Sequence, residues 1–458
     1  MEKGGDERHI LLVSFPGLGH INPTLEFAKR VVRLGVKVTF LTAKIALKSI
    51  PRSSPPLSGI TFVGYSTDYG EGRKPVDDNV AHFMSEIQLR GSNKLSEMLS
   101  SSAASEEGGR QLPFSRLVYA TLMPWAAEVA RAHHVPATLL WLQPAAIFDI
   151  YHYYFNEGYD EEINQANNSS SWSIHLPGMP NLGRDDLPSF LVSKSKDFEY
   201  AIPLYKEHFT VLQSFDEGPP QDILVNTFES LEPDALKAIP QLNLIPIGPL
   251  VSLIQDNQNS SDYMEFLDSK PKGSVIYASF GSHTPLSVLQ IHEIGQGLKT
   301  SGRPFLWVIR DTPNDESWVN YVGEMEKQGK IISWCSSQVD VLNHPSVGCF
   351  VSHCGWGSTL ESLGCGVPMV CFPLWIDQMT NAKLVQDVWR IGVRVKKELQ
   401  IEIVKGEEFK RCIEMVMMMG LEGEEMRKNA QNWKLLTQEA GKLGASSDLN
   451  LNVFINKL

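Results

Sequence analysis

The sequence has little cysteine, and what it has is unevenly placed. Its 458 residues contain 6 cysteines, all between Cys335 and Cys412. Secreted proteins stabilised by disulfides space their cysteines as a framework along the chain, and no such framework is present. We therefore predict free thiols in a reducing, cytoplasmic compartment. The run that includes His353 and Cys354 has some zinc character, but adjacent His and Cys chelate poorly and a second ligand pair is missing, so we predict no metal.

Long hydrophobic runs and an excess of positive charge are also missing. The first apolar run, residues 10–15, is too short for a signal peptide or a membrane-spanning helix. The formal net charge is −12, whereas nucleic acids and anionic membranes attract a basic face. We expect neither a nucleic-acid partner nor membrane insertion, and a phosphate ligand would have to be held by local groups.

The composition is that of a folded globular protein, with 42% hydrophobic and 21% charged residues. A chain of 458 residues exceeds what one hydrophobic core supports, so we expect two domains of roughly 200 residues each. Residues 9–15 form an apolar run typical of a parallel strand buried on both faces. A glycine turn follows, then a helix that we expect to begin at Asn22 and Pro23 and to end at Gly35, and a second strand over 36–42.

The same strand and helix alternation recurs along the chain. In the first half we expect strands over 116–119 and 137–142 around a helix over 124–133. In the second half we expect strands at 272–281, 305–309, 330–333, 348–352 and 368–372, with helices at 286–299 and 380–389.

This pattern predicts an α/β protein with two facing, doubly wound, Rossmann-like domains and a ligand cleft between them. The predicted boundaries are an N-terminal domain over 1–245, a linker over 246–265, a C-terminal domain over 266–440, and a last segment, 441–458, that packs back on the N-terminal domain.

The most informative local pattern is a strand that turns through small residues into a helix, between residues 348 and 363. The free N–H groups and the dipole at the start of such a helix bind anions, and Gly355, Gly357 and Ser358 leave room for a diphosphate. The pattern is equally typical of a tight structural turn with a buried histidine, and the residues alone leave both readings open.

The surrounding stretch resembles the signature box of the plant family 1 UDP-dependent glycosyltransferases. The resemblance rests on Trp334, Gln338, His344-Pro-Ser, GCFVSHCGW at 348–356, STLESL at 358–363, GVP at 366–368, Asp377 and Gln378, and it extends to GHINP at 19–23 and GASSDLN at 444–450. It covers essentially the whole chain and is strongest for the group that glucosylates phenolics, anthocyanins and small carboxylic acids. The family has the GT-B fold and transfers a sugar from a UDP-sugar to a small acceptor without a metal.

The resemblance assigns a donor role to a set of residues in the second half. Trp334 would stack on uracil, Gln338 would bind its edge, and Glu361 would accept the ribose hydroxyls. The diphosphate would be met by the start of the helix at Trp356, Gly357 and Ser358, together with His353 and Ser282. Asp377 and Gln378 would bind the sugar, and the glutamine favours UDP-glucose.

The catalytic candidate is His20, in the first strand-to-helix loop of the other domain. A neutral imidazole can take a proton from an acceptor hydroxyl as the oxygen attacks the anomeric carbon, and direct displacement inverts that carbon. The alternative to a catalytic role is that His20 only caps or packs at the start of a helix. We predict that the acceptor is bound by Phe15, Gln143, Phe148 and Trp375, although Trp375 is also explained as a packing aromatic.

The sequence departs from the family pattern at three places. Ala120 replaces the aspartate that usually orients the histidine, and we predict that Thr121 partly substitutes for it in catalysis. Gly357 replaces an asparagine, and the segment from Trp334 to Gln338 is one residue longer than usual.

Two alternatives to a working transferase remain. A nicotinamide-dependent oxidoreductase is disfavoured because no Gly-x-Gly-x-x-Gly follows the first strand. A catalytically impaired UDP-sugar-binding homologue is compatible with Ala120. We expect a monomeric enzyme.

Overall fold

The structure is a computed structural model, and its chain divides into two compact units. It describes residues 8–48, 50, 58–68, 80–101, 114–169, 171–193, 195, 198–213, 221–253, 262–281, 286–310, 316–397, 403–418 and 420–458. The first unit takes its residues from 1–184, 190–251 and 440–458, and the second from 185–189 and 252–439. Each unit is built around its own parallel sheet.

The first unit contains a 7-stranded sheet in the order β3-β2-β1-β4-β5-β8-β9, with every neighbouring pair parallel. Its strands are β1 (His9–Val13), β2 (Lys37–Ala43), β3 (Ile60–Tyr65), β4 (Arg116–Ala120), β5 (Ala137–Trp141), β8 (Asp222–Val225) and β9 (Asn243–Pro246). The central strands are apolar throughout because helices cover both faces of the sheet. Ile245 and Pro246, which we expected at the junction between the domains, lie in the edge strand β9.

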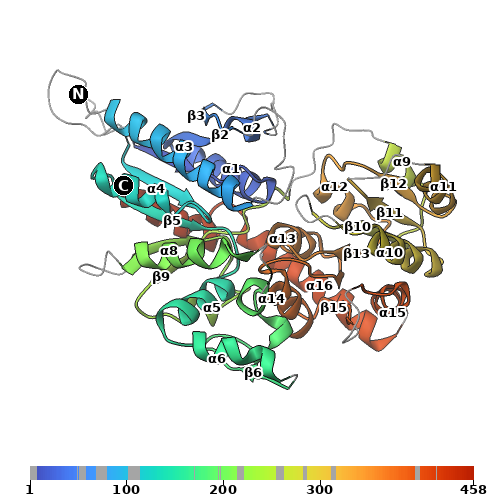
Figure 1. Ribbon diagram of the computed structural model, residues 1–458. Coiled ribbons are helices and arrows are strands. Elements are labelled where there is room, and N and C mark those ends of the chain that lie inside the picture. The colour runs from blue at the N-terminus through green and yellow to red at the C-terminus, as the bar shows by residue number, and fades with distance from the viewer. Residues whose placement is uncertain are drawn as a thin grey trace. The chain divides into compact units, whose positions relative to one another are not determined.

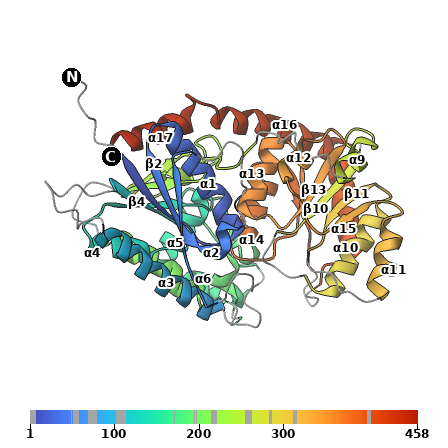
Figure 2. The ribbon, with the colours of Figure 1, turned by 90° about the horizontal axis from the view of Figure 1, so that it is seen from above.

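Helices form a layer on each face of this first sheet. They are α1 (Leu18–Arg33), α2 (Lys44–Leu47), α3 (Val80–Ser101), α4 (Trp125–Ala132), α5 (Ala145–Asn156), α6 (Asp160–Asn164), α8 (Ala201–Gln213) and α17 (Ser446–Asn456), and α7 (Ser189–Val192) starts in the second unit. Figure 2 shows α1 and α17 on one side of the strands and α3 and α4 on the other. Leu451, Phe454 and Ile455 of α17 join α1 in one buried cluster, so the C-terminal helix completes the core of the first unit.

The second unit contains a 6-stranded parallel sheet in the order β12-β11-β10-β13-β14-β15. Its strands are β10 (Val275–Ser279), β11 (Phe305–Val308), β12 (Lys330–Ile332), β13 (Val347–Ser352), β14 (Met369–Cys371) and β15 (Gly392–Arg394). All five strands that we predicted in this half are present, each within a few residues of the expected bounds.

The helices of the second unit are α9 (Asp262–Asp268), α10 (Val288–Thr300), α11 (Glu316–Met325), α12 (Gln338–Asn343), α13 (Trp356–Cys365), α14 (Gln378–Lys383), α15 (Gly406–Met417) and α16 (Leu421–Ala440). In Figure 2, α10 and α11 lie on one side of the strands and α12 and α13 on the other. A short antiparallel ribbon, β6 (Ser173–Ile174) with β7 (Leu182–Gly183), belongs to the first unit. None of the described helices is long and apolar enough to cross a membrane.

The predicted start of the first helix is wrong. Helix α1 begins at Leu18, so Asn22 is not its N-cap and Pro23 lies inside the helix. The backbone N–H groups of His20 and Ile21 both donate to the carbonyl of Gly17 at 2.9 Å, and the N-cap is Gly17, five residues before the predicted Asn22. His20 therefore lies in the first helical turn. The predicted end is confirmed, because α1 stops at Arg33 and Gly35 adopts a left-handed φ of 78°.

Both sheets reverse their strand order next to their first strand. In the first sheet, β2 and β3 lie on one side of β1 and β4 on the other, and the second sheet repeats this with β11 and β12 on one side of β10 and β13 on the other. In open parallel sheets, ligands bind at the carboxyl ends of the strands at such a reversal. His20 follows β1, and His353 follows β13, so both histidines lie at the expected edge of their own sheet. The helices that follow these two strands, α1 and α13, are labelled in Figure 1.

Candidate active site

The turn after β13, residues 352–358, combines a strained backbone with the start of a helix. Cys354 has a left-handed φ of 64°, a conformation that costs a non-glycine residue about 1–2 kcal/mol. Its N–H donates to Ser352 Oγ at 3.2 Å, and Gly355 is the N-cap residue of α13. The N–H groups of the first turn of a helix have no partner within the helix and point outward. We call residues 352–358 the β13 turn; it presents these donors and the positive end of the α13 dipole at the sheet edge.

His353 is held at this edge by two glycines. A Cβ added to Gly281 would lie 2.7 Å from His353 Nε2, and one added to Gly355 would lie 2.5 Å from it. Both distances are shorter than van der Waals contact allows, so any larger residue would displace the ring. Ser282, the predicted neighbour of His353, lies outside the described residues. The two glycines therefore place a half-exposed imidazole beside the N-terminus of α13.

A hydrogen-bonded network joins α12 to α13. Gln338 Nε2 donates to Glu361 Oε2 at 2.5 Å and to Ser358 Oγ at 3.0 Å, and Gln338 Oε1 accepts from the Tyr277 hydroxyl at 3.1 Å. Desolvation raises the pKa of Glu361 to about 7, although the hydrogen bond from Gln338 opposes the rise. A carboxyl group with this pKa can hold a proton until a ligand offers it better hydrogen bonds.

The turn after β12, residues 333–338, absorbs the extra residue noted in the sequence. Ser336 is hydrogen-bonded to the Tyr263 hydroxyl at 2.6 Å, and Ser337 is the N-cap of α12, where its Oγ accepts the N–H of Asp340 at 3.2 Å. The longer turn therefore ends in a helix cap, Ser337, and Gln338 still reaches Glu361.

Trp334, at the start of that turn, is 54% exposed. The Arg310 guanidinium lies 4.5 Å from the centre of its ring, so Arg310 covers one ring face. An indole that is covered on one face and exposed elsewhere is suited to stacking a flat ligand on its remaining surface.

The turn after β14, residues 374–378, is braced from three directions, and we call it the β14 turn. Gln378 Oε1 accepts the N–H groups of Leu374 and Trp375 at 2.9 and 2.8 Å. Asp377 Oδ2 accepts from Asn381 Nδ2 at 2.8 Å. Ile376 has a left-handed φ of 47°. The turn therefore has one defined shape, with Trp375 and Asp377 half-exposed at the edge of the sheet.

The third brace of the β14 turn comes from a segment far away in the sequence. Ser189 donates its N–H to the Ile376 carbonyl and accepts the Ile376 N–H on its Oγ, both at 2.9 Å. Three residues earlier, Asp186 is paired with Arg394 at 2.7 Å and with Lys383 at 3.3 Å. Residues 185–189, although they precede most of the second half of the chain, are thus part of the second unit.

In the first unit, His20 is half-exposed and its backbone is secured on both sides. The hydroxyl of Thr24 donates to the His20 carbonyl at 2.6 Å and is itself hydrogen-bonded to Ser14 Oγ at 3.2 Å. Phe15 lies edge-on to the imidazole with 5.2 Å between ring centres. These contacts hold His20 in a fixed position at the carboxyl end of β1.

Ala120, at the end of β4, and Thr121, which follows it, are buried and contact the core of the first unit. Ala120 is completely buried in the core cluster of the first unit. Thr121 is also completely buried, and its Oγ1 accepts the N–H of Leu142 at 2.8 Å and lies 3.4 Å from the carbonyl of Leu140. The catalytic role predicted for Thr121 would require this hydroxyl to leave its partners in and just after β5.

The predicted acceptor residues occupy different environments. Phe15 is half-exposed beside His20, whereas Gln143 is 9% exposed and its Oε1 accepts from the Tyr205 hydroxyl at 3.4 Å. Phe148 is completely buried, with its ring centre 5.2 Å from Trp141 and 5.1 Å from Phe209. This placement does not support a contact between Phe148 and an acceptor, because an aromatic run in a helix that packs on a sheet is drawn into the core.

Comparison with known proteins decides the family. Residues 234–422 match the family model described as UDP-glucoronosyl and UDP-glucosyl transferase. UDP-glycosyltransferase 75C1 of Solanum lycopersicum is 50% identical over 98% of this chain and 98% of its own. The chain belongs to the UDP-glycosyltransferase family. Phloretin 4'-O-glucosyltransferase of Malus domestica, a second family member, is 45% identical, with 99% of this chain and 98% of its own covered.

The fold of this glycosyltransferase agrees with its relatives. The solved structure of Os79 from O. sativa, in complex with U2F and trichothecene, has a TM-score of 0.81 and 32% identity, and the match covers 98% of this chain and 99% of that one. Two doubly wound units, each with a parallel sheet, make up the GT-B fold, as predicted. The chain is a UDP-glucosyltransferase, and a UDP-sugar is its donor substrate.

Two of the departures from the family pattern have a structural explanation in this transferase. A Cβ built on Gly357 meets no atom within 4 Å, so the side chain that the family usually carries there would extend into open space without strain. The longer segment before Gln338 ends in the cap of α12, Ser337. Trp356, predicted among the donor residues, is 5% exposed and packs 5.9 Å from Trp389, so only its backbone N–H is positioned for a ligand.

Several residues that brace the transferase site were missed in the sequence. Phe83, in the first turn of α3, lies at right angles to Phe15 with 6.1 Å between ring centres, and no local pattern indicated it. Ser189 is separated by almost two hundred positions from the turn that it holds. Asn381 had a usable signal, because four residues after Asp377 is one helical turn.

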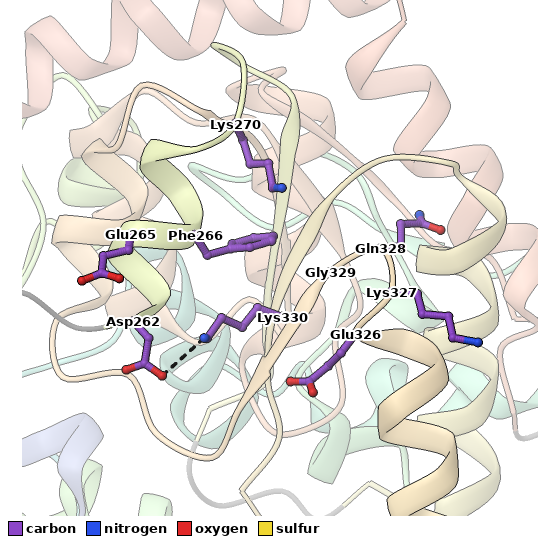
Figure 3. A pocket seen from close by; sticks show the side chains of 9 residues that line it. All are labelled: Asp262, Glu265, Phe266, Lys270, Glu326, Lys327, Gln328, Gly329 and Lys330. Carbon is purple, nitrogen blue, oxygen red and sulfur yellow. Dashed lines mark hydrogen bonds and ion pairs between the residues drawn. The ribbon is translucent and has the colours of Figure 1, made fainter.

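A charged pocket lies beside α9 and the start of β12 in the second unit (Figure 3). It is lined by Asp262, Glu265, Phe266, Lys270 and residues 326–330, and Lys330 Nζ lies 3.4 Å from Asp262 Oδ2. Lys330 is the first residue of β12, so the pocket is at the amino ends of the strands. It contains none of the predicted donor residues, and open parallel sheets bind their ligands at the other end.

Proposed function

We propose that this enzyme transfers glucose, with inversion, from UDP-glucose to a hydroxyl or carboxyl group of a small phenolic, flavonoid or aromatic acid. His20 acts as the general base. The relatives named for phloretin and for other phenolics support the acceptor class, and the glutamine at position 378 supports glucose as the sugar.

One observation carries the donor half of this proposal. Three turns at the carboxyl edge of the second sheet present complementary groups: Gln338 and Glu361 for the nucleoside, the β13 turn for the diphosphate, and Asp377 with Gln378 for the sugar. The order of these groups across strands β12, β13 and β14 follows the order of base, phosphate and sugar in a UDP-sugar.

The chemical step needs a base and a stabilised leaving group. His20 takes the proton of the acceptor hydroxyl as the oxygen forms its bond to the anomeric carbon, and the bond from that carbon to the diphosphate oxygen breaks. The negative charge that develops on UDP is met by the N–H groups at the start of α13 and by His353. A carboxylic acid acceptor arrives ionised and needs no base.

We further propose that the acceptor is acidic. Ala120 provides no carboxylate to orient and charge the base, which weakens proton abstraction from an ordinary alcohol. A phenol or a carboxylic acid depends less on the strength of the base. Equal rates with aliphatic alcohols and acidic phenols would refute this preference.

A second candidate, an impaired homologue that binds UDP-sugars without turning them over, is favoured by the same Ala120. UDP release from UDP-glucose with a panel of phenols and aromatic acids separates the two. His20→Ala should lower transfer to phenols by about 10²–10⁴-fold, the range of general base catalysis, whereas the exposed His175→Ala should not. Acceptor-independent UDP release, or equal rates for both variants, would overturn the role of His20.

Ala120→Asp introduces the carboxylate that usually orients the histidine, and so tests directly whether its absence at position 120 weakens His20 as a base. A gain with weakly acidic acceptors supports the proposed reason for the acceptor preference, and no gain with any acceptor makes that position irrelevant to catalysis. The monomeric state and the cytoplasmic location expected from the sequence stay predictions, which size-exclusion chromatography and fractionation of plant cells can test.

A further inference from the structure

Asn381 connects two turns of the donor site through a single amide group. It lies in α14, is completely buried, and donates from Nδ2 to the carbonyl of Cys354 at 2.9 Å and to Asp377 Oδ2 at 2.8 Å. Cys354 belongs to the β13 turn and Asp377 to the β14 turn. An amide nitrogen has two hydrogens in one plane, so these two bonds use both and fix the plane of the side chain.

The orientation of this amide follows from its partners. Both partners are acceptors, so the nitrogen, rather than the oxygen, must face them. Asn381 Oδ1 is buried and has no hydrogen-bond partner among the described residues, which costs about 1–3 kcal/mol relative to a satisfied group.

The two turns joined by Asn381 are those that need fixing. Cys354 has a left-handed φ of 64° in the turn that faces the diphosphate. Asp377 needs a defined carboxylate orientation if it is to hold sugar hydroxyls. The strands that precede these turns, β13 and β14, are hydrogen-bonded neighbours, so one side chain can span both.

We propose that Asn381 is a positioning residue that sets the spacing between the diphosphate and the sugar of the donor. This inference rests on the proposed function, because it takes UDP-glucose as the occupant of the two turns. Asn381 does not touch the reacting atoms; it acts through the Cys354 carbonyl and the Asp377 carboxylate. Its loss should therefore affect the sugar more than the nucleotide.

The decisive measurement is the ratio of the dissociation constants for UDP-glucose and UDP. Asn381→Ala deletes both bonds and should raise this ratio at least about 5-fold over that of the wild type, with a matching rise in KM for UDP-glucose. Asn429→Ala is the matched control, because Asn429 also donates its Nδ2 to a backbone carbonyl, that of Arg390, at 3.1 Å in the same unit. The control should leave the ratio unchanged.

Asn381→Asp adds a second measurement, the pH dependence of kcat/KM, which a purely structural role of Asn381 would leave unchanged. It places a carboxyl group against Asp377, so near neutral pH the two carboxylates repel, while at low pH they can share one proton and restore a hydrogen bond. The loss of kcat/KM relative to wild type should exceed about 30-fold near pH 8 and shrink below about pH 6. The charged groups on the other side of α14, Asp186, Asp387 and Arg394, are unaltered by the substitution and cancel in this comparison.

Failure of this inference is distinguishable from failure of the proposed function. If the wild type neither binds nor uses UDP-glucose, the proposed function is wrong, and the ratio is measured with the UDP-sugar that the wild type does bind. If Asn381→Ala or Asn381→Asp unfolds, a double-mutant cycle with Asn381→Ser and Asp377→Ala replaces that variant. The KM for UDP-glucose is measured for both single variants and for the double variant, and we expect the two effects to be non-additive. An unchanged ratio in Asn381→Ala, or additive effects in the cycle, overturns the positioning role.

Discussion

Donor binding should be controlled by the ionisation of Glu361. Its pKa in the unliganded protein is about 7 because the carboxyl group is desolvated. In the proposed binding mode the ribose hydroxyls donate to Glu361. A carboxylate accepts these bonds more strongly than a protonated carboxyl group does, so donor binding favours the ionised form and lowers the pKa of Glu361. Binding therefore releases a proton, and the affinity for UDP-glucose rises with pH until the free carboxyl group is fully ionised.

The size of this effect follows from the fraction of enzyme that is ionised before binding. With a pKa of about 7, roughly 3% of Glu361 is ionised at about pH 5.5 and roughly 90% at about pH 8. The dissociation constant for UDP-glucose should therefore be about 30-fold higher at the lower pH, which corresponds to about 2 kcal/mol. Above about pH 8 the affinity should be flat, since no further ionisation of this group occurs.

Titration calorimetry with UDP-glucose measures both consequences. UDP-glucose is preferred to UDP because both of its phosphates are esterified and do not titrate in this range. Experiments near pH 6 in two buffers of different ionisation enthalpy should show close to one proton released per donor bound. Glu361→Gln should bind more weakly than wild type at pH 8 and lose the pH dependence. A flat wild-type profile, or an unchanged slope in Glu361→Gln, would refute the reasoning.

Three further predictions concern single side chains around the donor. Gly357→Asn should tighten UDP binding about 10-fold, the value of one hydrogen bond to a charged group, while Gly357→Ala should not; equal affinities of the two would contradict this. Ser189→Ala, which removes the acceptor for the Ile376 N–H, should raise KM for UDP-glucose about 5-fold with UDP binding unchanged, and weakened UDP binding would count against a specific effect on the sugar. Arg310→Gln should weaken UDP binding about 3-fold because it uncovers Trp334, and Arg310→Lys should weaken it less. Fluorescence titration measures both affinities, and wild-type affinity in both variants would contradict this prediction.

Much of the fold could be predicted from local pattern. Continuous apolar runs such as residues 9–13 and 347–352 indicated buried parallel strands, because a strand covered on both faces has no polar side. The predicted start of α1 was wrong for an equally local reason. Asn22 and Pro23 are residue types preferred at a helix start, but hydrogen bonds to the Gly17 carbonyl begin the helix earlier.

The candidate site was predicted only in part. Gln338, Glu361, Asp377 and Gln378 were recognisable from motif, and the second unit places the first two in direct contact. Phe148, which we predicted as an acceptor residue, is completely buried, and its contact with an acceptor stays a prediction. An aromatic residue in a helix has the same sequence signal whether it lines a pocket or fills a core. Ser189 gave no signal, since nothing near it in the sequence relates to the turn that it braces.

The sequence by itself determined the elements, their alternation and the chemistry available at each turn, because strand and helix periodicity and the preferences of small residues act over a few positions. Only the tertiary structure decided which groups hold the turns in place. Asn381 reaches Cys354 across 27 positions and Ser189 reaches Ile376 across 187, and such contacts depend on which strands the sheet makes neighbours. Strand order is settled by packing of the whole unit, and no local pattern carries it.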